Sequence, residues 1–179
     1  MPPTFGIANS VTTVRAVLTL LVALAIAKSP APSAAWFAVG AAVAATALDG
    51  VDGWAARRFG QASAFGARFD MEVDAALIMT LSVLAWKWDK AGAWVLLSGL
   101  LRYLFVAAGW IRPWMSRPLE PRRRRQTVCV IQIVALIVVV SPIAAPPLST
   151  ALAAAALAIL GWSFAIDTSW LLHRRQQVA

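Results

Sequence analysis

The chain has 179 residues, of which 60% are apolar and 13% are charged, and its formal net charge at pH 7 is +8. This apolar share exceeds the ~45–50% of a soluble domain, so the composition favours an integral membrane protein. The basic balance then fits loops that face anionic lipid head groups, and no nucleic-acid partner is expected. The single Cys129 and the single His173 exclude an intramolecular disulfide and any metal site built from several cysteines or histidines.

Apolar segments separated by polar or proline-containing connections predict six spanning helices, each near the ~20 residues that a bilayer requires. Their expected ranges are 10–27, 33–58, 67–86, 91–110, 126–140 and 148–172. The sequence therefore predicts an all-α polytopic membrane protein with one domain over residues 1–179. Cys129 lies in an apolar run of the fifth helix and is expected to serve packing.

The basic residues divide between the two ends of this six-helix arrangement. Lys28, Lys87 and Lys90 fall at one end, whereas the arginines fall at or nearer the other. The positive-inside rule then places both termini and the arginine-rich end in the cytoplasm. Because the short chain shows no eukaryotic targeting tail, a bacterial inner membrane is the expected location.

Carboxylates concentrate in residues 49–74, which hold five of the eight acidic residues of the chain. Asp49 and Asp52 are separated by three positions, and Asp70 and Asp74 by four, so each pair shares one face of a helix. Ionisable groups within membrane segments usually have a function. Close carboxylates need a counter-charge, and their oxygens suit one or two Mg²⁺ or Mn²⁺ ions. The active site is therefore expected at the cytoplasmic side.

Small residues follow the same helix faces as these carboxylates. Gly53, Ala56 and Gly66 would leave room for a ligand beside the metals, and Arg57 would pair with a phosphate. The simpler alternative is that Asp49 and Asp52 form a solvated helix end and that the small residues serve helix packing. That alternative explains single residues better than it explains the whole spacing.

The spacing resembles the signature of the CDP-alcohol phosphotransferase family at eight positions over 26 residues, without a departure. The signature runs Asp49-x-x-Asp52-Gly53-x-x-Ala56-Arg57, then eight residues, then Gly66-x-x-x-Asp70-x-x-x-Asp74. A weaker resemblance lies in the first helix, where Asn9-x-x-Thr12-x-x-Arg15 is similar to the start of family members. The six-helix pattern extends the resemblance over most of the chain.

The resemblance implies an enzyme that displaces CMP from a CDP-linked alcohol, usually CDP-diacylglycerol, by the hydroxyl of an acceptor alcohol. It implies divalent metals held by Asp49, Asp52, Asp70 and Asp74, with Asp74 also the general base. The residues that it implies for binding the CDP-alcohol are Thr12, Thr13, Val14, Arg15, Gly53, Ala56, Arg57, Ser63 and Gly66. Family members are commonly homodimers.

Basic residues near the aspartates are candidates for binding the acceptor, and they are Arg68, Arg102, Arg117 and Arg122. Arg102 either binds a phosphate or pairs with an acid such as Asp167. The Arg122–Arg125 run is typical of a cytoplasmic anchor, although it would also draw an anionic acceptor to the site. The fifth helix matches only loosely the Gly-Lys-x-Lys-Thr-x-x-Gln pattern of members that use glycerol phosphate.

Other functions remain open at this stage. A cardiolipin-type or CDP-choline or CDP-ethanolamine-type reaction would use a lipid acceptor. A cation transporter would use the intramembrane aspartates as a path, but no acidic residue continues such a path through the outer halves of the helices. A noncatalytic lipid-binding scaffold would have no need for four aspartates.

Overall fold

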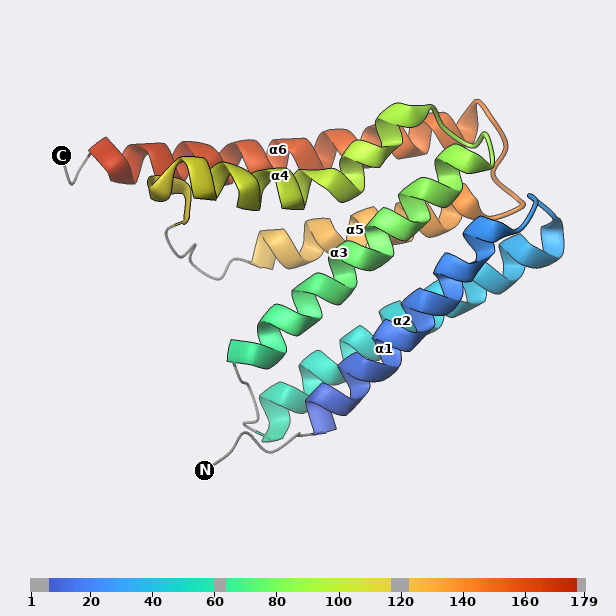
Figure 1. Cartoon of the computed structure of the whole chain (residues 1–179), viewed down its shortest axis with the longest axis horizontal. Coiled ribbons are helices and arrows are strands. Elements are labelled where there is room, and N and C mark those ends of the chain that lie inside the picture. Colours follow the sequence, from blue (N-terminus) through green and yellow to red (C-terminus); the bar gives the residue numbers. More distant parts are fainter. Residues whose placement is uncertain (1–6, 60–63, 117–122, 177–179) are drawn as a thin grey trace.

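The computed structural model describes residues 7–59, 64–116 and 123–176, and within these ranges every regular element is a helix (Figure 1). The helices are α1 (Ile7–Leu24), α2 (Pro32–Phe59), α3 (Ala64–Lys87), α4 (Leu97–Ile111), α5 (Arg123–Val140) and α6 (Leu148–Gln176). Short 3₁₀ segments add Ala25–Ala27, Ala93–Leu96 and Pro113–Ser116. The predicted all-α architecture and the order of six helices are confirmed.

Four described segments are long and apolar enough to cross a membrane, namely Ser10–Ala27, Pro32–Gly50, Ala93–Ile111 and Leu148–His173. The remaining helices, α3 and α5, are more charged: α3 carries the aspartates, and α5 begins with three arginines. α3 packs against α1, α4 and α5, and α5 also packs against α2 and α6. Each of these two helices thus packs against three others within the bundle.

The helices alternate in direction, so the connections α1–α2, α3–α4 and α5–α6 meet at one end of the bundle, at the right in Figure 1. Lysines join these connections to one another. The Lys87 ammonium donates to the carbonyl of Ile26, and the Lys90 ammonium donates to the carbonyls of Ser141 and Ala144. Ser149 donates to the carbonyl of Lys90 at 2.6 Å. We call this end, which also carries Lys28, the lysine end.

Small residues let the helices approach closely in the core. α2 presents Ala35, Ala38, Ala42 and Ala45 on one buried stripe, and α1 packs along α2. Since lipid is as apolar as these side chains, the packing rests on close van der Waals contact rather than on exclusion of water. Larger apolar residues of α3 and α5, such as Leu81 and Leu136, fill the remaining interior.

Gly99 in α4 marks the tightest contact between α4 and α3. A Cβ atom there would lie 2.7 Å from the Cα of Met79, so the backbone itself would have to move. We expect Gly99→Ala to lower the free energy of unfolding by about 1–3 kcal/mol, the usual cost of overpacking.

Thermal unfolding in detergent, followed by loss of helical circular dichroism, measures this effect. Gly161→Ala in α6 is the matched control, because nothing lies within 4 Å of a Cβ at that position. Alanine favours a helix over glycine, so the control should melt at or slightly above the wild-type temperature. Equal melting temperatures for Gly99→Ala and wild type would contradict the close approach.

Candidate functional site

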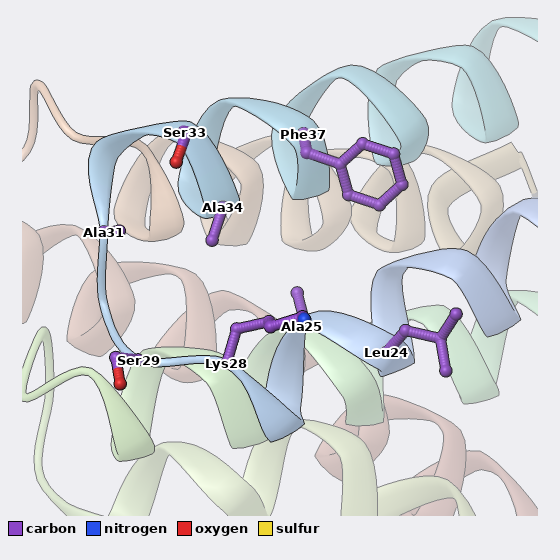
Figure 2. Close-up of a pocket in the computed structure, with 8 residues that line it drawn as sticks. All are labelled: Leu24, Ala25, Lys28, Ser29, Ala31, Ser33, Ala34 and Phe37. Atoms are coloured by element: carbon purple, nitrogen blue, oxygen red, sulfur yellow. The ribbon is translucent and has the colours of Figure 1, made fainter.

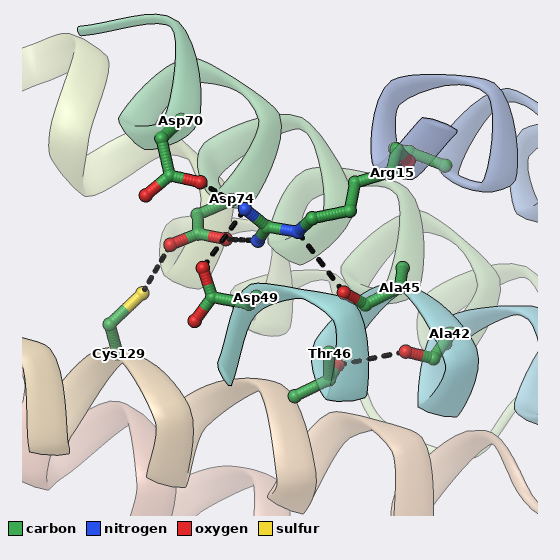
Figure 3. Close-up of polar contacts among 9 residues, drawn as sticks. Arg15, Ala42, Ala45, Thr46, Asp49, Asp70, Asp74 and Cys129 are labelled. Carbon is green, nitrogen blue, oxygen red and sulfur yellow. Dashed lines mark hydrogen bonds and ion pairs between the residues drawn. The ribbon is translucent and has the colours of Figure 1, made fainter. Parts of the chain in front are cut away.

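Three aspartates from two helices converge in the interior of the bundle. Asp49 comes from α2, and Asp70 and Asp74 come from successive turns of α3 (Figure 3). They offer one oxygen each within 4.8 Å of one another, and all three side chains are partly buried. The convergence follows from the spacing, because a separation of four residues returns Asp74 to the face of Asp70.

Arg15 of α1 binds all three carboxylates. Its Nη1 lies 2.9 Å from Oδ1 of Asp49 and also contacts Asp70, while its Nη2 pairs with Oδ1 of Asp74. The Nε donates to the carbonyl of Ala45 at 3.1 Å. With 1% of its side chain exposed, Arg15 is a buried cation whose position is fixed by contacts from two other helices, α2 and α3.

The donor set of this cluster suits a hard divalent cation. Arg15 contacts a single oxygen, Oδ1, of each carboxylate, so the second oxygens remain for other partners. Three carboxylates also exceed the charge of one guanidinium, and the cluster stays net negative. Mg²⁺ and Mn²⁺ prefer such oxygen ligands. The described part of the site therefore fits a divalent metal.

Cys129 contributes a contact that packing alone does not explain. Its Sγ lies 3.7 Å from Oδ2 of Asp74, so the thiol donates to the carboxylate oxygen that does not pair with Arg15 (Figure 3). Cys129 also packs against the hydrophobic core, as expected, so this contact adds to its packing role. α5 thereby becomes the fourth helix at the site, and the sequence held no signal for it because the residues around Cys129 are apolar.

The first-helix residues implied by the resemblance divide by helix face. Thr12 is buried on the face of Arg15, three positions before it, whereas Thr13 and Val14 are exposed on other faces of α1. At the start of α3, Gly66 is partly buried one turn before Asp70, and Arg68 is exposed. Three of the candidate site residues, Ser63, Arg117 and Arg122, lie outside the described part of the structure. Within α2 the structure describes the backbone, but not the side-chain surroundings, of Asp52, Gly53, Ala56 and Arg57.

Two further arginines in the described part of the chain, Arg102 and Arg124, pair with acids of neighbouring helices. Arg102 of α4 pairs with Glu72 of α3, so its acid partner is Glu72 rather than Asp167. Asp167 of α6 instead binds Arg124, which also donates to the hydroxyl of Ser163 at 2.6 Å. These pairs link α3 to α4 and α5 to α6, and they account for Arg102 and Arg124 without a ligand.

Removal of the Arg15 guanidinium should expose the repulsion among the aspartates. We expect Arg15→Met to lower the free energy of unfolding by about 3–5 kcal/mol when metals are chelated, because it leaves buried carboxylates without a counter-charge. Added Mn²⁺ should recover part of the loss, since a divalent cation supplies positive charge to the same oxygens. Thermal unfolding in detergent with EDTA or Mn²⁺ measures both effects.

Arg102→Met is the control, because the Arg102–Glu72 pair is largely exposed and should contribute no more than about 1 kcal/mol. If Arg15→Met melted like wild type in EDTA, the buried guanidinium would not stabilise the cluster.

Comparison with known proteins gives one match. The model of the family described as CDP-alcohol phosphatidyltransferase matches residues 5–166, nearly the whole chain. No curated protein and no solved structure matches. The matched range includes α1 to α5 and most of α6, with all residues of the aspartate cluster.

Proposed function

Because this chain belongs to the CDP-alcohol phosphatidyltransferase family, we propose that it transfers the phosphatidyl group of CDP-diacylglycerol to a small polar alcohol and releases CMP. The family establishes a membrane phosphotransferase that takes its phosphatidyl group from a CDP-alcohol. The observation that supports the finer statement is the convergence of Asp49, Asp70 and Asp74 beside Arg15. Such a cluster offers the oxygen ligands and the negative charge that divalent metals need.

Asp49, Asp70 and Asp74 would hold Mg²⁺ or Mn²⁺, and the family motif adds Asp52 to this set. Members of this family generally depend on divalent metals. When bound, such a metal offsets the charge of the diphosphate and of the departing CMP. Asp49 on one helix and the α3 pair on another fix the carboxylates from two sides, so their positions need little reorganisation when substrate binds.

Asp74 is our candidate for the general base. It would take the proton of the acceptor hydroxyl while that oxygen attacks the phosphorus that carries the diacylglycerol. One P–O bond forms to the acceptor, and the bond between this phosphorus and the bridging oxygen breaks, so CMP leaves with the bonding electrons. The thiol of Cys129, which donates to Oδ2 of Asp74, would help to hold the carboxylate in a fixed orientation.

The donor and acceptor would approach from the arginine-rich end. The motif assigns Gly53, Ala56, Arg57, Ser63 and Gly66 to the CDP part. Arg68 remains an acceptor candidate because its side chain is exposed near the start of α3. Lipid acceptors, as in cardiolipin-type or CDP-choline or CDP-ethanolamine-type reactions, remain the alternative.

We also propose that the arginine-rich end faces the cytoplasm of a bacterial inner membrane and that the enzyme is a homodimer. The excess of arginines at or nearer that end supports this orientation, because cytoplasmic loops carry the excess of positive charge and the other end has only Lys28, Lys87 and Lys90. The proposal of a homodimer rests only on the fact that members of this family are commonly homodimers.

Asp74→Asn should abolish most turnover, because an amide cannot accept the hydroxyl proton, while binding of a CDP ligand should largely persist. Loss of a general base typically costs about 10²–10⁴-fold in rate. CMP release and equilibrium binding of a CDP ligand separate the two effects. The matched control is Asp89→Asn, which should keep full turnover because Asp89 lies at the lysine end, away from the cluster. Full activity of Asp74→Asn would remove it as the base.

The proposed reaction is tested by CMP release from CDP-diacylglycerol by purified protein in detergent with Mg²⁺ or Mn²⁺. Glycerol 3-phosphate, inositol phosphate, inositol, serine and phosphatidylglycerol are added one at a time. A metal-dependent increase in CMP with one of them, together with a new lipid, supports the proposal and names the acceptor. A cation transporter would release no CMP under any of these conditions.

A further inference from the structure

A groove opens at the lysine end, between the end of α1 and the start of α2 (Figure 2). It has a volume of about 540 Å³, and its walls are mostly apolar. Leu24 and Phe37, both exposed, lie at one end, and Ala34 points into it from α2. Ser29 and Ser33 stand near the connection between the two helices, so the groove has an apolar part and a polar part.

Lys28 supplies the charge of this groove. Its side chain folds back along the groove toward Ala25 (Figure 2). Among the described residues its ammonium has no partner, whereas Lys87 and Lys90 each donate to backbone carbonyls. Asp89 is the only described acid at this end, and no ion pair joins it to Lys28. The groove therefore presents an uncompensated cation beside apolar walls.

Two tryptophans indicate where this groove lies relative to the bilayer. Trp36 in the second turn of α2 and Trp86 near the end of α3 are both about half exposed at the lysine end. Exposed tryptophan is typical of the lipid–water interface. An apolar groove at that level contacts acyl chains, and a cation at its rim lies at the height of the head groups.

We propose that this groove binds an anionic phospholipid of the leaflet opposite the aspartate cluster. An acyl chain would lie along Leu24, Ala34 and Phe37, and the head-group phosphate would pair with Lys28 and accept hydrogen bonds from Ser29 and Ser33. The site is separate from the donor site. Leu24 lies nine residues after Arg15 on α1, about 14 Å along the axis, and Phe37 lies twelve residues before Asp49, about 18 Å along α2.

Native mass spectrometry of the purified full-length protein tests the proposal. Phosphatidylglycerol and phosphatidylcholine with identical acyl chains serve as probes, because both carry the same phosphate diester but the choline cation makes phosphatidylcholine neutral overall. The wild type should retain phosphatidylglycerol about fivefold more strongly, which is the usual effect of one lysine near an anionic lipid. Lys28→Gln should abolish this preference. Arg112→Gln, which removes an exposed charge at the other end, should keep it.

A second variant tests the apolar part. Ala34→Phe should fill the groove and weaken retention of both lipids, with its melting temperature checked against wild type. If Lys28→Gln kept the wild-type preference for phosphatidylglycerol, the proposal would be overturned, because annular lipid alone would then explain the binding. An unchanged retention in a folded Ala34→Phe variant would overturn the assignment of the acyl chain.

Discussion

The contact on which the rest of the structure depends is that between one buried guanidinium and three carboxylates inside an apolar helix bundle. Arg15 brings α1 against Asp49 of α2 and against Asp70 and Asp74 of α3. Isolated charges are expensive in such surroundings, and they persist where they are paired or coordinate metals. The cluster thus fixes three helices at the level where the proposed chemistry takes place, and the α2 alanine stripe allows α1 to come close enough.

The two ends of the bundle use their charges in different ways. At one end, acids bind arginines of neighbouring helices, as Asp167 of α6 binds Arg124 of α5. At the lysine end, two of the three lysines hold backbone carbonyls of the connections, and Lys28 projects along a groove. This asymmetry suits a protein in which catalysis occurs at one membrane surface and the other surface contributes stability and lipid contact.

Much of this arrangement can be predicted from the sequence. Apolar length and proline positions predict the six helices, and the i, i+4 spacing predicts that Asp70 and Asp74 share a face. Contacts between distant segments cannot be derived in this way. Cys129 reaches Asp74 only because α5 packs against α3, and Glu72 rather than Asp167 pairs with Arg102 because α4 lies along α3. Local patterns give the face of a helix but not the helix that covers it.

The most direct test of the account is whether these carboxylates hold a divalent cation. Mn²⁺ binding to the purified protein in detergent, followed by electron paramagnetic resonance, measures this without any substrate. The account predicts saturable binding that weakens at least about tenfold in Asp70→Asn, because one ligand oxygen loses its charge. Equal Mn²⁺ affinity in wild type and Asp70→Asn would contradict the assignment of the cluster as the metal site.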